Sequence, residues 1–311
     1  MEKEIYLAGG CFWGTEHFFR HSSFILETEV GYANGSITDP TYEQVCSGTT
    51  GFVEAVRLTY DSAIISLPQI LDLFFLTIDP TSVNRQGNDI GEQYRTGIYY
   101  TDPADAPVIA AALTRLEQMV GAPIAVEQKP LQNFYRAETM HQNYLNKNVF
   151  GYCHIDRSLF SLAKEYTPKE TVDRDEKGNY LPFLTYKVTQ FGCTEKPYEN
   201  AYWDCFDDGI YVDAVTGTPV FTSKEKFFSD SGWPAFTAPI TPEAVVERPV
   251  ECSCCQKVRL FNRAQNAYLG VVFSDDASDG AHYCINSAAL RFVPKEALEE
   301  EGLGEFRSLW A

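Results

Sequence analysis

Cys11 stands in the sequence GGCFWG, between a predicted strand and a predicted helix. A thiol at a helix N-terminus feels the positive end of the helix dipole, which lowers the thiol pKa and favours the thiolate. The flanking glycines allow close backbone approach. Phe12 and Trp13 would form an apolar wall that suits a methyl group. By itself the stretch is compatible with a buried packing cysteine among aromatic neighbours and with a nucleophilic cysteine, and further residues have to decide between them.

Further side chains along the first half could donate protons or a second thiol. Tyr42 and Glu54 flank a glycine-containing turn in TYEQVCSGTTGFVEAV, and Asp89 and Tyr94 lie in QGNDIGEQYRTGIYY. Cys153 lies in HQNYLNKNVFGYCHID. A nucleophilic thiol, an acid, hydroxyls and a spare thiol are the groups needed to reduce an oxidised substrate. They would attack it, protonate the departing oxygen and form a disulfide.

The composition excludes some classes of partner and indicates the compartment of the protein. The net charge of −18 argues against nucleic acid and anionic membranes as partners. No stretch reaches the roughly 18 apolar residues of a membrane span, and no basic and apolar leader opens the chain, so we expect a cytoplasmic protein. The nine cysteines are then free, catalytic or metal-binding thiols. Cys46 has no activating neighbour in sequence, and we expect it to be a packing thiol.

The first half alternates predicted strands and helices. These predict an α/β domain at residues 1–160, a ferredoxin-like mixed sheet with helices. The expected strands are 4–8, 27–35, 54–61 and 96–101, and the expected helices are 15–24, 66–79 and 106–120.

The rest of the chain differs in composition. Residues 161–182 are charged and have little apolar periodicity, so we expect a linker. Residues 183–311 predict a mostly β domain of small barrel-like sheets. Its expected strands are 186–192, 209–217, 218–223, 268–275 and 282–293.

GGCFWG, YEQVC, TGFVEAV, QGNDIGEQYRTGIYY and HQNYLNKNVFGYCHI, in this order over about residues 3–157, resemble methionine sulfoxide reductase A. The resemblance implies that Cys11 attacks the sulfoxide sulfur and becomes a sulfenic acid as methionine leaves. One departure is Phe52, which stands where the family usually has histidine. The other implied roles are a methyl pocket for Phe12 and Trp13, protonation of the sulfoxide oxygen by Glu54 with hydrogen bonds from Tyr42 and Tyr94, a hold on the substrate backbone by Asp89, and attack by Cys153 to give a disulfide that thioredoxin reduces.

YKVTQFGCTEKPYENAYWD, GIYVDAVTGTPVF, KFFSDSGWPAF, YLGVVFSD and HYCINSAALRFV resemble methionine sulfoxide reductase B, over about residues 183–295. That enzyme reduces the other sulfoxide epimer. The two reductases occur fused in this order in some bacteria. The resemblance implies that Cys284 is the nucleophile, Trp233 the wall for the methyl group and Asn286 a hydrogen-bond partner.

The second half departs from its family at several positions. Tyr268 and Val271 stand where the family has two histidines, and valine does no acid chemistry. His282 replaces a usual arginine and is either the missing acid or a surface histidine. Ser231 occupies the usual place of the resolving cysteine. The remaining candidates to resolve Cys284 are Cys193, which we prefer, and Cys252, Cys254 and Cys255.

Many reductases of the second type hold a structural zinc through two CxxC pairs. Here the positions of the first pair hold Asp213 and Thr216, and those of the second hold Asn262 and Gln265. A single CxxC, Cys252–Cys255, has no partner pair. We therefore expect no bound metal.

Together these patterns predict a reductase of methionine sulfoxide in peptides and proteins. The first domain would act on the S epimer and the second on the R epimer, each through sulfenic acid and disulfide steps. Thioredoxin or another external dithiol would restore the thiols without a bound cofactor, and the role would be protein repair. One alternative makes the second half a degenerate docking module. Another, based on the CSCC run, is a cysteine-rich metal-binding protein.

Overall fold

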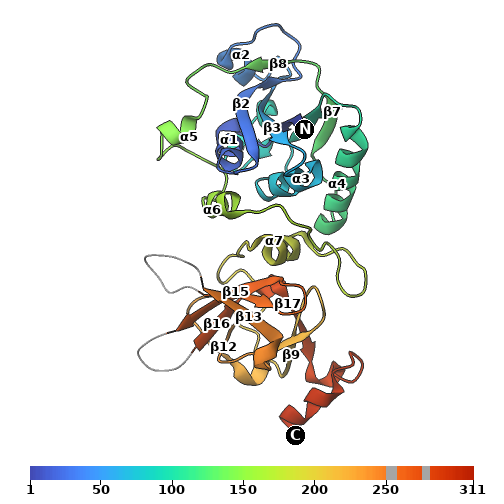
Figure 1. Cartoon of the computed structure of the whole chain (residues 1–311). Helices are drawn as coiled ribbons and strands as arrows, with labels where there is room; N and C mark the ends of the chain where they lie inside the picture. Colours follow the sequence, from blue (N-terminus) through green and yellow to red (C-terminus); the bar gives the residue numbers. More distant parts are fainter. Residues whose placement is uncertain (250–257, 275–280) are drawn as a thin grey trace. The chain divides into compact units, whose positions relative to one another are not determined.

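The computed structural model describes residues 1–249, 258–274 and 281–311. They form two compact units, Met1–Glu170 and Thr171–Ala311. Each unit has its own sheets (Figure 1). The predicted fold class is confirmed: the first unit is a mixed sheet with helices, and the second is mostly β. Among the described residues, no helix combines the length and the apolar character that crossing a membrane requires.

The first unit is built on one sheet with the strand order β7-β6-β1-β3-β2-β8. Neighbouring strands are antiparallel except β6 and β7, which are parallel. The central strand β3 is buried along nearly its whole length, so it fixes the position of any side chain it carries. The strands are β1 (Glu2–Ala8), β2 (Ile25–Ala33), β3 (Val53–Asp61), β6 (Gly97–Tyr100), β7 (Glu127–Pro130) and β8 (Phe134–Arg136), with a separate pair β4 (Arg85–Gln86) and β5 (Asp89–Ile90).

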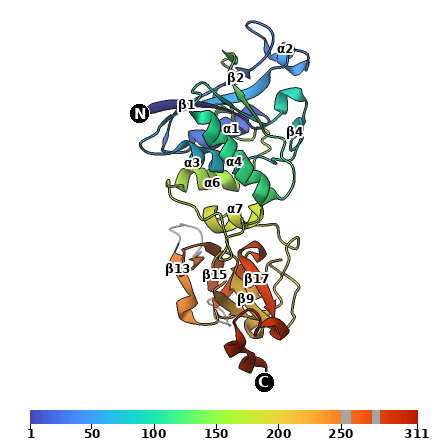
Figure 2. The same cartoon turned by 90° about the vertical axis from the view of Figure 1, so that its right-hand side faces the viewer.

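Capping residues mark the start of one helix and the end of another in the first unit. The Ser66–Gln69 capping box starts α3, with Pro68 in its first turn, and Gly121 ends α4 in the left-handed conformation. In both views α3 and α4 lie side by side (Figures 1 and 2). The helices are α1 (Phe12–Arg20), α2 (Tyr42–Cys46), α3 (Leu67–Leu76), η1 (Glu92–Tyr94), α4 (Asp105–Val120), α5 (Tyr144–Lys147) and α6 (Ser158–Glu165).

The second unit contains two sheets, β10-β9-β17 and β11-β12-β16-β15-β14-β13. All described pairs in them are antiparallel. Its strands are β9 (Gly209–Asp213), β10 (Pro219–Thr222), β11 (Lys226–Phe227), β12 (Ala235–Phe236), β13 (Val245–Pro249), β14 (Val258–Asn262), β15 (Tyr268–Ser274), β16 (Ala281–Ile285) and β17 (Leu290–Pro294). Its helical elements are α7 (Phe183–Phe191), η2 (Ser223–Glu225), η3 (Pro242–Ala244), η4 (Ser287–Ala289), η5 (Lys295–Ala297) and η6 (Gly304–Trp310).

Three expected elements differ from the structure. The predicted single strand 282–293 is wrong, because this segment holds the end of β16, the turn η4 and most of β17, and the two strands lie in different sheets. The predicted strand 186–192 is wrong, because this segment lies in helix α7. The helix ends at Gly192, which adopts the left-handed conformation at φ 74°. Val188 and Phe191 are both buried and lie three residues apart, as on one face of a helix. In so short a segment, the spacing of apolar residues does not distinguish the period of 2 of a strand from the period of 3.6 of a helix. The helix expected at 15–24 begins earlier and ends at Arg20.

The division between the units falls at Glu170–Thr171, inside the segment expected to be a linker. On its N-terminal side, α6 buries Ala163, whose carbonyl accepts a hydrogen bond from Ser22 at 3.3 Å. Residues 171–182 belong to the second unit. The boundaries at residues 160 and 183 therefore stay predictions, and both sides of the segment make ordered contacts.

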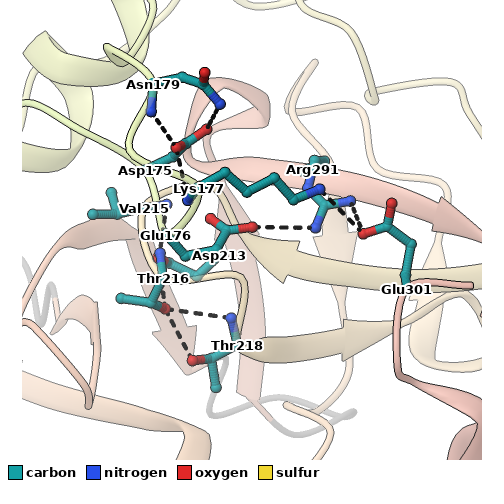
Figure 3. Close-up of polar contacts among 10 residues, drawn as sticks. All are labelled: Asp175, Glu176, Lys177, Asn179, Asp213, Val215, Thr216, Thr218, Arg291 and Glu301. Atoms are coloured by element: carbon teal, nitrogen blue, oxygen red, sulfur yellow. Dashed lines mark hydrogen bonds and ion pairs between the residues drawn. The ribbon is translucent and has the colours of Figure 1, made fainter.

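A charged turn holds the start of the second unit to its sheet (Figure 3). The Asp175 carboxylate accepts the backbone N–H groups of Lys177 and Asn179 at 2.9 and 2.8 Å. Arg291 on β17 pairs with Glu176 at 3.6 Å and with Glu301 at 3.1 Å. Ion pairs on a surface contribute only about 0–1 kcal/mol each. Arg291 takes part in both ion pairs and thereby holds Glu176 of this turn next to β17.

We predict that Gly270→Ala destabilises the second unit by about 3 kcal/mol. A Cβ at Gly270 would collide with the backbone carbonyl of Cys284 on the neighbouring strand, which cannot move aside. Urea denaturation of the second unit measures the change. Gly178→Ala is the matched control: its left-handed φ of 82° meets open space, so only about 1 kcal/mol of backbone strain is expected. Equal costs for the two variants would contradict the β15–β16 register.

Candidate active site

Cys11 lies at the N-cap of α1, directly after the glycine pair that follows β1. It is 7% exposed. Gly10 has a φ of +80°, and a Cβ there would lie 2.5 Å from the Cβ of Gln86. The turn that presents the thiol therefore requires glycine at this position.

Glu54 of β3 lies beside this thiol and is 1% exposed. Its Oε2 accepts the Phe12 N–H at 3.1 Å. Burial raises the pKa of Glu54 to about 8, and the negative charge of Asp89 adds to the rise. Glu54 therefore carries a proton at neutral pH, which makes it a buried acid next to a thiol.

The pKa of Cys11 shifts opposite to the direction that the helix N-terminus predicts. Burial raises it well above its ordinary value, and the negative charge of Glu54 acts in the same direction. The backbone N–H of Trp13 lowers it, but by less. Desolvation of the charged form thus outweighs the helix dipole, and the group at rest is a thiol rather than a thiolate.

Aromatic rings enclose the site. The Trp13 ring stacks on Tyr144 with centroids 3.7 Å apart, and its Nε1 donates to Nδ1 of His141 at 3.3 Å. The buried His141 ring also lies 5.4 Å from Phe12 and 4.6 Å from Tyr42. Sequence reasoning missed His141, although it stands in the HQNYL stretch already singled out.

Glu138 was also missed, and it fixes the same wall. Its carboxylate accepts the Tyr32 hydroxyl at 2.7 Å and the backbone N–H of Tyr42 at 2.9 Å. Burial and the bond to Glu138 raise the pKa of Tyr32. Glu138 therefore ties β2 to the start of α2, which carries Tyr42.

Tyr42 and Tyr94 keep their protons beside the acid. Burial raises both pKa values, and the charge of Glu54 adds to the rise. The Tyr42 side chain also contacts Cys46 through a hydrogen bond. The expectation that Cys46 packs in the core is wrong, because the residue is exposed on α2.

Cys153 lies against the first turn of α1. A Cβ on Gly14 would be 3.0 Å from the Cys153 Sγ, and the charge of Cys153 contributes to the raised pKa of Cys11. A cavity of about 210 Å³ opens beside Cys153, with His17 and Phe160 among its lining residues.

The flanks of Cys153 dock on the loop that carries Asp89. The Tyr152 hydroxyl accepts the Asn88 N–H at 3.2 Å and also bonds to Asp89. The His154 Nδ1 lies 3.7 Å from the Asp89 carboxylate. Burial lowers the pKa of His154 to about 4, so this imidazole is neutral. Asp89 thus contacts both neighbours of Cys153, and its negative charge also raises the pKa of Cys11.

In the second unit, Cys284 lies on β16 and is partly buried. Its Sγ donates to the Ser231 Oγ at 4.0 Å. Burial raises the pKa of Cys284, and the bond to Ser231 opposes that rise. Val271 is its direct cross-strand partner on β15. Tyr268 instead packs under the Arg259 guanidinium, 4.7 Å from the ring centroid.

Glu195, which sequence reasoning missed, braces this second site. Its carboxylate accepts the backbone N–H groups of Ser287 and Ala288 just after Cys284. Its own N–H donates to Asn286 Oδ1 at 3.2 Å, and its carbonyl accepts Trp233 Nε1 at 3.1 Å. One residue therefore connects Trp233 and Asn286, the two expected neighbours of the thiol.

The remaining candidates of the second site include His282 and Cys193. The His282 ring packs 5.1 Å from Phe227. Cys193 follows Gly192, whose Cβ position adjoins Arg259 and Tyr268, and its charge raises the pKa of Tyr268. The other resolving candidates, Cys252, Cys254 and Cys255, lie outside the described residues.

The residues at the zinc positions of the second unit do not fit zinc. Asp213 accepts the N–H groups of Val215 and Thr216 at 2.9 and 2.7 Å, as Figure 3 shows. Asn262 Oδ1 accepts the N–H groups of Gln265 and Ala267 at 3.1 and 2.9 Å. These acceptors close their own turns and include no thiolate or imidazole, the donors that structural zinc sites use. Among the described residues, no group of His, Cys, Asp and Glu could hold a metal ion.

Comparison with known proteins connects these two sites to chemistry. A family model described as peptide methionine sulfoxide reductase matches residues 3–171, and one described as the SelR domain matches residues 181–294. Reduced Mxr1 from Saccharomyces cerevisiae is 38% identical over 54% of this chain and 93% of that chain, with a TM-score of 0.48. Methionine sulfoxide reductase A of Corynebacterium diphtheriae is 34% identical over 49% and 77%, with a TM-score of 0.45. Mxr1 in complex with Trx2 is 30% identical over 46% and 84%, with a TM-score of 0.34.

The raised pKa of Glu54 predicts how the stability of the first unit depends on pH. Between about pH 4.5 and pH 8 the unfolded chain loses this proton while the folded chain keeps it. The free energy of unfolding therefore falls across that window, by up to about 5 kcal/mol, and the loss is constant above it. Glu54→Gln removes the charge and should remove this loss.

The measurement is urea denaturation at pH 5 and pH 9, followed by Trp13, the one tryptophan before residue 171. We expect Glu54→Gln to gain several kcal/mol over the wild type between the two pH values. The control Glu43→Gln, at an exposed position on α2, should show no such gain. A pH-independent difference between Glu54→Gln and the wild type would contradict the buried acid.

Proposed function

The chain belongs to the peptide methionine sulfoxide reductase family and carries a SelR domain, and we propose how its residues divide the work. The first unit reduces the S epimer of methionine sulfoxide at Cys11, and the second reduces the R epimer at Cys284. The observation that carries the first assignment is the buried Glu54 carboxyl, which accepts the Phe12 N–H beside the Cys11 thiol.

In the first unit, the substrate methyl group rests against Phe12 and Trp13, whose rings are held by His141. The Cys11 sulfur attacks the sulfoxide sulfur, and the proton of Glu54 goes to the sulfoxide oxygen. Tyr42 and Tyr94 keep their protons, so they donate hydrogen bonds to that oxygen. The substrate leaves as methionine, and the oxygen stays on Cys11 as a sulfenic acid. The Cys11 thiol proton returns to Glu54.

Cys153 then attacks the Cys11 sulfenic acid. A disulfide forms, and the sulfenic oxygen leaves as water with the Cys153 thiol proton and its own. This role for Cys153 is supported by its place against the first turn of α1. Asp89, whose negative charge raises the pKa of both thiols, would hold the substrate backbone before this step.

We propose thioredoxin as the protein that reduces the disulfide, without any bound cofactor. Support comes from the similarity to Mxr1, which has been solved in complex with Trx2. Cys153 is only partly buried, and the neighbouring Phe150 is 96% exposed. Substrates would be oxidised proteins and peptides. The free thiols among the described residues support a reducing compartment, and we propose the cytoplasm.

A second candidate function for the second unit is docking without catalysis. Val271 lies directly opposite Cys284, where the family resemblance expects a histidine, and it supplies no proton. Against this alternative, Glu195 still holds Trp233 and Asn286 near the thiol. We therefore favour an active second site.

Single-site variants should separate the two activities. Cys11→Ser should lower turnover of the S epimer at least 100-fold and leave the R epimer unchanged, because serine is a far weaker nucleophile. Cys284→Ser should do the reverse. The assay follows methionine released from separated epimers of a methionine sulfoxide peptide with dithiothreitol, and each epimer is the folding control for the other. An unchanged S rate in Cys11→Ser would sink the first assignment.

Cys153→Ser should stop recycling by thioredoxin while leaving the first chemical step intact. We expect one methionine per chain from the S epimer without reductant, then a thioredoxin-supported rate at least 10-fold below the wild type. Cys205→Ser, at another free cysteine, is the matched control and should recycle normally. Normal thioredoxin turnover by Cys153→Ser would show that another thiol resolves Cys11.

A further inference from the structure

The Ser231 hydroxyl is the polar group that contacts the second thiol. It lies in the turn before Trp233 and is half-buried. Its Oγ receives the Cys284 S–H at 4.0 Å. Gly232, at a φ of +77°, holds this turn in place by accepting the Tyr198 N–H at 2.8 Å. The hydroxyl therefore has a fixed position at the sulfur.

The hydrogen bonds of the Ser231 side-chain hydroxyl all have its oxygen as the acceptor, while the Ser231 backbone N–H donates to the Ser229 hydroxyl at 3.2 Å. Besides Cys284, the Ser229 hydroxyl donates to it at 3.0 Å and the Trp233 N–H at 3.4 Å. None of the hydrogen bonds within the described part of the chain uses the Ser231 hydroxyl as a donor. Donors that converge on one hydroxyl oxygen polarise its O–H bond. Ser231 thus has a polarised proton to give to a bound molecule.

Other candidate acids near Cys284 are engaged elsewhere or cannot donate. Val271 has no proton to give, and the His282 ring packs on Phe227. Both carboxylate oxygens of Glu195 accept backbone N–H groups. Tyr268 lies under Arg259. Within the described ranges, the side-chain hydrogen bond of the Cys284 sulfur goes to Ser231.

We propose that Ser231 is a catalytic residue of the second site, which donates to the sulfoxide oxygen and relays the Cys284 thiol proton to it. This inference rests on the proposed R-epimer activity of the second unit. It assigns to Ser231 the acid role for which His282 was one candidate.

The step balances without an outside acid. The Cys284 sulfur gives an electron pair to the sulfoxide sulfur and is oxidised to a sulfenic acid, while the sulfoxide is reduced to the thioether. The substrate S–O bond breaks, and an S–O bond to Cys284 forms. Ser231 passes its proton to the transferred oxygen and takes the S–H proton in return. Burial raises the pKa of Cys284, so that proton is present at neutral pH.

The test is single turnover of the R epimer without reductant, measured as methionine formed per chain in Ser231→Ala and Ser231→Thr. We expect Ser231→Ala to be about 100-fold slower than the wild type, as for the loss of one donor to a developing oxyanion. Ser231→Thr retains the hydroxyl and should stay within about threefold. S-epimer turnover in the same samples reports intact protein. The matched control Ser223→Ala, which removes a hydroxyl bonded to the Gly209 N–H, should keep the wild-type R rate.

Either of two results would overturn the proton relay and leave the proposed R-epimer activity in place. One is a wild-type R rate in Ser231→Ala, and the other is a Ser231→Thr variant as slow as Ser231→Ala. The second result would show that the shape of the turn matters rather than its hydroxyl. Absence of R turnover in the wild type would instead remove the proposed activity of the second unit, and the relay with it. The slow alanine and fast threonine variants together support the relay.

Discussion

The hydrogen bond from the Phe12 N–H to the Glu54 carboxyl is the contact on which the first site depends. It joins the first turn of α1 to the start of the central strand β3, across 42 residues of sequence. A carboxyl this deeply buried must be neutral or well bonded to be tolerated. The same bond that satisfies it also fixes the thiol-bearing turn. Acid and nucleophile are therefore positioned by one interaction between two rigid elements.

Sequence patterns predicted the components of this site better than their electrostatics. Cys11, Phe12 and Trp13 form a local motif, and the local pattern placed them at a helix start, which the structure has at Phe12. The direction of the Cys11 pKa depends on how much water the folded chain removes, and no local pattern contains that information. His141 and Glu138 are further examples, since their roles arise only when β2, α2 and the segment after β8 meet.

The second unit stabilises two of its turns with side chains that differ from those of the family it resembles. Where its family resemblance suggests four thiolates around a metal, Asp213 and Asn262 close two backbone turns with hydrogen bonds. The sequence showed the missing cysteines but not this substitute, because an Asp or Asn in a turn has many local uses. The helix at 183–191 was missed for a similar reason, since its sequence also has more than one local interpretation. Its burial on several sides comes from packing against β15 and η4.

The contacts of residues 173–180 bear on how such a chain can be divided. Because Glu176 and Lys177 are tied to Arg291 and Glu301, this turn is structurally part of the second unit although it precedes its first helix. A fragment that began at α7 would leave Arg291 without Glu176. An independently expressed second unit would need to begin near Thr171 to retain its full set of contacts.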